Sequence, residues 1–114
     1  MRLFIRCVEG EVRLGPGKIQ LLELIDTHGS ISEAARAMNM SYRRAWLLVA
    51  ELNQGFRQPV TAAQTGGTGG GHAELTAFGH ELVGLYRKIE QDAAAAVAGS
   101  MERLAEQLAV RAEA

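Results

Sequence analysis

The spacing of apolar residues along the chain predicts a mainly helical protein that opens with a small hairpin. Short apolar runs up to Val8 and over 12–14 flank a Glu-Gly-Glu turn, and they read as two strands whose role the sequence does not reveal. Further on, Ile19, Leu22 and Ile25 recur three residues apart, as on one face of a helix. A proline near its start and a glycine just past its end set the bounds of this helix at residue 16 and about residue 28.

The stretch 30–48 predicts two short helices joined by a tight turn. Ser32 can cap the first of these helices and Ser41 the second, because a serine hydroxyl accepts the free amide hydrogens of a helix start. Ala35 has almost no side chain and lets the second helix cross closely, and Asn39 tolerates the left-handed backbone of the turn. The pattern is that of a helix-turn-helix and indicates DNA binding.

The second of these helices separates an apolar stripe from a face suited to the major groove. The stripe consists of Ala45, Leu48, Val49, Leu52 and Phe56. Arg43 and Leu47 lie opposite, and the first residues of a recognition helix meet base edges, so Arg43 is our candidate for base readout. Arg44, with Ser41 and Tyr42, can hold a phosphate at the helix start. The alternative is a solvated helix that carries two surface arginines.

A glycine-rich segment after this helix predicts a β-hairpin that serves as a wing. Residues 60–65 and 72–75 read as short strands, and residues 66–71 form a tip that contains five glycines. A tip without side chains lets the backbone approach the sugar-phosphate chain or the minor groove. A flexible linker is the alternative. The polar side chains that the wing offers to DNA are Thr65, Thr68 and His72.

A helix capped by Thr76 carries apolar residues with heptad-like spacing. On a helix that leaves the compact domain, such spacing suggests pairing with a second copy of the chain. Gly99 and Ser100 are expected to interrupt this helix and to leave a short amphipathic helix that starts at Met101. The alternative for the first members of the stripe, Phe78 and Leu82, is that they complete the core. The dimerisation residues that we expect are Leu82, Leu85, Ile89 and Ala93.

Several runs together resemble the DNA-binding domain of the ModE-type molybdate-responsive regulators, and more distantly the winged helix of LysR-type regulators. They are residues 15–19, 29–32, 40–46, 66–71 and 75–79. The resemblance implies that the chain binds operator DNA as a dimer, while separate C-terminal domains of that family bind the oxyanion. Two departures stand out. The sequence ends at Ala114, which leaves no room for molybdate-binding barrels, so an oxyanion ligand is not expected from this chain alone. In the wing, Thr68 stands where a lysine is usual in that family.

The distribution of charge and the cysteine content indicate where the chain would bind DNA and in which compartment it is expected. The net charge is −1, but residues 30–72 carry four arginines against two glutamates, whereas residues 73–114 carry four cations against seven anions. The expected binding unit is therefore locally basic and the tail acidic. Cys7 is the only cysteine, and the sequence has neither a long apolar run nor a signal-peptide pattern. We therefore expect a cytoplasmic protein that does not enter a membrane.

Nothing in the sequence favours an enzyme. His28, His72 and His80 are far apart and have no metal-ligand spacing, so neither a catalytic site, a metal nor a cofactor is expected. We predict an α+β fold, mainly α with a small β-wing, in which residues 1–75 form a winged helix-turn-helix and residues 76–114 a helical dimerisation extension. The expected function is sequence-specific transcriptional regulation by a homodimer on an inverted-repeat operator in double-stranded DNA. A protein-interaction or scaffold module built on a winged helix is the alternative.

Overall fold

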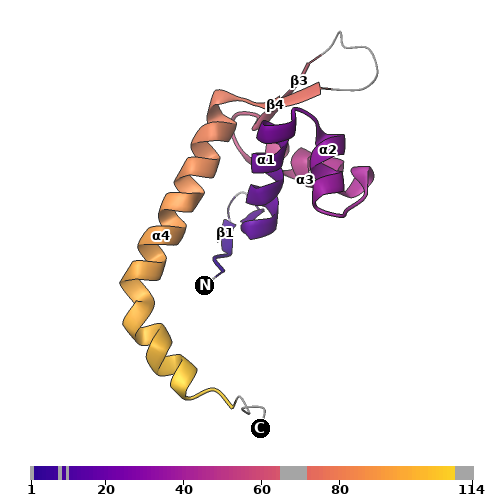
Figure 1. Ribbon diagram of the computed structural model, residues 1–114. Helices are drawn as coiled ribbons and strands as arrows, with labels where there is room; N and C mark the ends of the chain where they lie inside the picture. The colour runs from indigo at the N-terminus through magenta and orange to yellow at the C-terminus, as the bar shows by residue number, and fades with distance from the viewer. Residues whose placement is uncertain (1, 8, 10, 65–71, 110–114) are drawn as a thin grey trace.

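A computed structural model describes residues 2–7, 9, 11–64 and 72–109. Thr65 and Thr68, predicted to contact DNA, lie outside these residues. The fold is mainly helical with two small hairpins, as predicted (Figure 1). Its elements are β1 (Ile5–Cys7), β2 (Val12–Leu14), α1 (Pro16–His28), α2 (Ile31–Ala37), α3 (Tyr42–Gly55), β3 (Thr61–Gln64), β4 (His72–Leu75) and α4 (Ala77–Glu106).

Helix α1 is the centre of the core, and its bounds are those predicted. Pro16 occupies the first helical position, and Gly29 ends the helix in the left-handed region at φ 76°. The Gly29 amide donates a hydrogen bond of 2.8 Å to the carbonyl oxygen of Ile25. The helix buries four large apolar residues, Ile19, Leu21, Leu22 and Ile25, against which α2, α3, β4 and the start of α4 pack.

The two predicted hairpins both form, and each is a separate two-stranded antiparallel sheet. In the first, Cys7 pairs with Val12 and Ile5 with Leu14. In the second, which is the predicted wing, Thr61 pairs with Leu75. The wing is attached to the domain through β4, because the Ala73 amide donates to the Gly29 carbonyl oxygen at 2.9 Å. The wing strands are therefore fixed to the end of α1.

Helix α4 is one continuous helix of 30 residues, about 45 Å long at 1.5 Å per residue. Thr76 caps it as predicted, because its hydroxyl oxygen accepts a 2.9 Å hydrogen bond from the Gly79 amide. The predicted interruption at Gly99 and Ser100 is wrong, since the helix runs on to Glu106. A single glycine costs only about 1 kcal/mol in a helix interior, and the alanines before it are the best helix formers.

The first three turns of α4 are built into the domain. Leu82 and Tyr86 are buried, and the Tyr86 hydroxyl donates to the carbonyl oxygen of Leu3. Burial raises the pKa of Tyr86. Arg87 donates to both carboxylate oxygens of Glu23 on α1, at 2.7 and 3.2 Å, and at 3.0 Å to Glu90. These hydrogen bonds raise the pKa of Arg87 and join α4 to α1.

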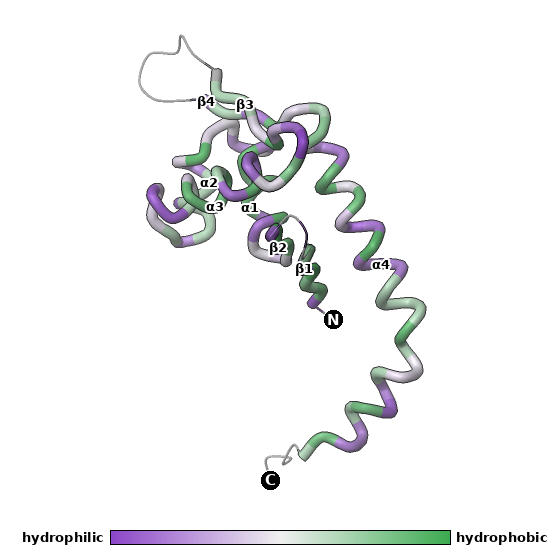
Figure 2. The backbone as a smooth tube through the Cα atoms, turned by 180° about the vertical axis from the view of Figure 1, so that it is seen from behind, coloured by the Kyte–Doolittle hydropathy of each residue, from purple (hydrophilic) through white to green (hydrophobic). Residues whose placement is uncertain are grey.

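The rest of α4 projects away from the domain (Figure 1), and the residues predicted to pair differ in their exposure. Leu82 is buried in the hydrophobic core, which is the alternative that the sequence left open for it, so it presents no surface to a partner. Leu85 is 52% exposed and Ile89 38% exposed, while Ala93 is partly buried. Figure 2 shows hydrophobic residues recurring along α4 well beyond the point where it leaves the domain.

None of the helices in the described ranges combines the length and the hydropathy that a bilayer crossing requires. Among the same residues, histidine, cysteine and acidic side chains form no group of three that could hold a metal ion.

Candidate nucleic-acid interface

Helices α2 and α3 form the predicted helix-turn-helix, with one correction to the first cap. Ser30, not Ser32, caps α2, because its hydroxyl oxygen accepts a 3.0 Å hydrogen bond from the Glu33 amide. Ser30 has the extended backbone of an N-cap, whereas Ser32 lies inside the first turn and is exposed. The serine followed three residues later by a glutamate is a capping-box pattern. Ser32 instead lines a groove between α3 and the second hairpin.

The turn and the second cap agree with the prediction. Asn39 adopts the left-handed conformation at φ 57°, which reverses the chain between α2 and α3. Ser41 caps α3 by accepting a 3.1 Å hydrogen bond from the Arg44 amide. Ala34 and Ala35 are buried, so α2 packs closely on its neighbours. The local chemistry therefore fixes the direction in which α3 leaves the turn.

Helix α3 exposes the face that the sequence assigns to DNA. Ala45, Val49 and Leu52 are buried, and Leu48 and Phe56 are partly buried, as the apolar stripe predicts. Arg43, Arg44 and Leu47 are all exposed on the remaining surface. Within the described part of the chain, the ion pairs do not include Arg43 or Arg44. Two cations without a carboxylate partner thus stand on the first turn of α3.

A groove separates α3 from the wing strands, and two predicted site residues lie in it besides Ser32. It is a cavity of about 380 Å³ bordered by Tyr42 and Trp46 of α3 and by His72 of β4. Tyr42 is 54% exposed and Trp46 50% exposed. A second cavity of about 190 Å³ continues the groove along α3 and shares Trp46 with the first.

Asn53 holds the wing against α3. Its side-chain oxygen accepts hydrogen bonds from the amides of Val60 at 2.7 Å and Thr61 at 3.2 Å. Its side-chain nitrogen donates to the Thr61 hydroxyl oxygen at 3.1 Å. Both polar atoms of one half-buried amide are therefore used to set where β3 begins relative to α3.

The sequence reasoning missed Trp46 and Asn53. A helical wheel centred on the buried stripe places both on the same flank of α3, next to Tyr42. Asn53, next to the buried Leu52, was the available signal, because a polar residue beside an apolar stripe needs a hydrogen-bond partner. The sequence does not show that this flank meets the wing.

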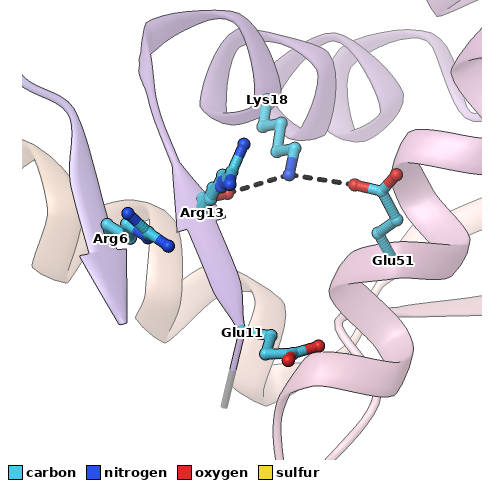
Figure 3. Close-up of a pocket in the computed structure, with 5 residues that line it drawn as sticks. All are labelled: Arg6, Glu11, Arg13, Lys18 and Glu51. Carbon is cyan, nitrogen blue, oxygen red and sulfur yellow. Dashed lines mark hydrogen bonds and ion pairs between the residues drawn. The ribbon is translucent and has the colours of Figure 1, made fainter. Parts of the chain in front are cut away.

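The other flank of α3 faces the N-terminal hairpin across a separate cavity of about 540 Å³ (Figure 3). Lys18 donates to the Arg13 carbonyl oxygen at 2.9 Å and to Glu51 at 3.1 Å, and so connects α1, β2 and α3. Arg6 and Arg13 pair across the hairpin, and Glu11 also lines the cavity. With three cations and two carboxylates, this cavity is nearly balanced in charge. The Lys18 hydrogen bond and the buried side chains of Val12 and Leu14 hold the hairpin on the domain, which gives a structural role to the segment that the sequence left unassigned.

Comparison with known proteins gives a consistent set of relatives. No protein-family model matches the chain. The chain is 42% identical over 81 residues to the molybdenum-pterin-binding protein MopA of Rhodobacter capsulatus, which is 71% of this chain and 31% of that protein. It is 36% identical over 93 residues to the molybdenum transport protein ModE of Azotobacter vinelandii, and the match covers 82% of this chain and 34% of that protein. It is 41% identical over 76 residues to the DNA-binding transcriptional dual regulator ModE of Escherichia coli, and the match covers 67% of this chain and 29% of that protein.

The chain spans between 29% and 34% of the length of these curated relatives. The matches cover at least 67% of the chain itself, more than the helix-turn-helix alone. The sequence identity to all three relatives points to one group of proteins. Over the matched residues, the chain is therefore similar to a part of the ModE-type proteins, about a third of their length.

Proposed function

We propose that this chain is a sequence-specific DNA-binding transcriptional regulator, with α3 in the major groove and the wing beside it. The proposal is carried by two exposed arginines on the first turn of α3, neither of which has a carboxylate partner among the residues that the structure describes. A scaffold has no need of two such cations at the start of one helix, whereas a recognition helix presents its first turn to base edges and phosphates. The name of the Escherichia coli relative, a DNA-binding transcriptional regulator, supports the same function.

Arg43 and Arg44 have different proposed roles. Arg43 is on the outward face of α3 and is proposed to read a base by two hydrogen bonds, as arginine does with guanine. Arg44 lies on the flank toward Glu51 and, with Ser41 and Tyr42 at the start of α3, is proposed to hold a phosphate. The remaining proposed DNA contacts are Ser32, Leu47, His72, Thr65 and Thr68.

The two roles are tested by binding measurements on a duplex recovered by selection from random DNA. Arg43→Ala should lower specific affinity by about 1–3 kcal/mol and relax the preference at one base position. Arg44→Ala should weaken all sequences about equally and reduce the salt slope by roughly one unit. If Arg43→Ala leaves affinity and preference unchanged, α3 does not read bases.

The proposed active form is a homodimer that binds an inverted-repeat operator. Support comes from α4, where a stripe of exposed apolar residues continues beyond the domain. The stripe contains Leu85, Ile89, Val97, Met101 and Leu104. Alone it would leave apolar area in water, and pairing two copies removes this area from water. A two-fold axis would place two recognition helices one DNA turn apart, ~34 Å or a multiple of it.

The dimer is tested by replacing both Leu85 and Ile89 with lysine. This variant should sediment as a monomer at micromolar concentration and lose most operator affinity. Lysines at Gln91 and Ala95, exposed on another face of α4, are the matched control and should leave the dimer intact. A wild-type chain that sediments as a monomer and still binds one half-site tightly would contradict the dimer.

A further inference from the structure

The groove between α3 and the wing is lined by hydrogen-bond donors and small apolar side chains. Trp46 contributes an indole N–H, which is a donor only, and the hydroxyls of Ser32 and Tyr42 can donate as well. Among the described residues, no carboxylate lines either of the two cavities that form the groove. Such a lining fits a ligand that offers acceptors and apolar faces. A sugar-phosphate strand offers both, in its phosphate oxygens and its deoxyribose rings.

The position of the groove matches the path of a DNA strand. A helix in the major groove has one strand's backbone on each flank. Tyr42 and Trp46 line the wing side of α3 and Glu51 the hairpin side. A helical wheel places Arg44 on the same flank as Glu51. A wing that reaches the neighbouring minor groove must straddle the strand between the two grooves of the duplex. The space between α3 and the wing strands is where that strand would pass.

The groove is kept open by its own residues. Ala63 and Ala73 are directly opposite each other in the β3–β4 ladder, and both line the two cavities. Larger side chains at these positions would fill the space that Trp46 faces. The three hydrogen bonds of Asn53 fix the separation between α3 and β3. The groove is therefore present before any ligand arrives.

We infer that this groove is a binding site for one sugar-phosphate strand of duplex DNA and that Trp46 is its central contact. The inference rests on the proposed function and adds a site on the wing-side flank of α3. The indole N–H donates to a phosphate oxygen, and the ring packs against a deoxyribose. Because the contact is to the backbone, it positions the protein on any sequence.

Trp46 is the single tryptophan of the chain, so intrinsic fluorescence reports on the groove directly. The full chain is titrated with a mixed-sequence duplex of about 30 base pairs, while fluorescence anisotropy of a labelled copy of the same duplex measures binding independently. Quenching by acrylamide is compared with and without the duplex. Bound DNA should reduce the quenching constant of Trp46 severalfold.

A pair of matched variants tests the groove without touching Trp46. Ala63→Leu fills the groove, whereas Ala62→Leu adds the same side chain on the other face of β3, because neighbouring strand residues alternate. Ala63→Leu should lower affinity about tenfold on specific and mixed-sequence duplexes alike. Ala62→Leu should bind as the wild type does, and equal circular dichroism spectra should show that both variants fold.

The outcomes separate the two proposals. If anisotropy shows binding but the quenching of Trp46 is unchanged, or if the two leucine variants bind alike, the groove is not the backbone site and the proposed function stands. If the wild-type chain binds neither the mixed-sequence duplex nor any selected duplex, the proposed function fails, and the groove site fails with it.

Discussion

Replacing Asn53 by alanine should both destabilise the domain and weaken its binding to DNA. The Asn53 side-chain oxygen accepts from the amides of Val60 and Thr61, and Val60 is fully buried. Alanine leaves both amides without this acceptor, and an unsatisfied buried donor costs about 1–3 kcal/mol. For one fully buried and one half-buried amide we expect a loss of about 2–4 kcal/mol in the free energy of unfolding.

This loss is a large part of the roughly 5–15 kcal/mol that stabilises a typical domain. At about 4 °C per kcal/mol it corresponds to a fall in Tm of roughly 8–16 °C. The assay is thermal unfolding followed by circular dichroism, at one fixed protein concentration because dimerisation would shift the apparent Tm. Duplex affinity is measured well below the lower Tm, so that any weakening reflects wing position and not unfolded protein.

Two further substitutions separate hydrogen bonding from packing. Asn53→Asp keeps the acceptor for both amides, and the Thr61 hydroxyl can donate to it, so its Tm should stay within a few degrees of the wild-type value. Asn53→Leu fills the volume without any acceptor and should be destabilised about as much as the alanine variant. If leucine restores the wild-type Tm, or if alanine and aspartate behave alike, the hydrogen-bond argument is wrong.

Two other predictions concern the part of α4 that packs on the domain. A Cβ at Gly79 would lie 2.1 Å from the Val60 carbonyl oxygen, so Gly79→Ala should lower Tm severely in circular dichroism melts. Gly84 has open space around it, so Gly84→Ala should leave the stability unchanged or raise it by up to about 1 kcal/mol. Because burial raises the pKa of Tyr86, the folded state favours its neutral form; this contribution is fully present below pH ~10 and is lost as pH rises through the folded-state pKa. Urea unfolding at increasing pH should show a steeper loss in the wild type than in Tyr86→Phe, and parallel pH profiles would contradict the role of burial.

Local chemistry made much of the fold predictable. Pro16 and a glycine after His28 bound α1, and Asn39, Ser41 and Thr76 have the conformations or caps expected of them. The first cap was misplaced although the signal was present, because Ser30 precedes Glu33 by three residues and Ser32 does not. The break at Gly99 was overestimated, since one glycine among alanines does not end a long helix.

The interface depends on tertiary contacts that a helical wheel does not contain. The wheel shows which face of α3 is exposed, and so it identified Arg43 and Leu47. It does not show which flank meets the hairpin and which meets the wing, and this determines the surroundings of Trp46 and Asn53. Leu82 and Leu85 illustrate the same limit: both lie on α4, but Leu82 is in the core and Leu85 is exposed.

The attachment of α4 bears on how the proposed dimer would read DNA. Tyr86 and Arg87 join α4 to the N-terminal segment and to α1, and Leu85 begins the exposed stripe beside them. In the described part of the chain, no linker therefore lies between the proposed pairing surface and the core that supports α3. In the proposed dimer, the angle at which two copies of α4 cross would determine the separation of the two recognition helices directly. A rigid connection of this kind favours a fixed half-site spacing, because a change of spacing would require α4 to break its contacts with α1.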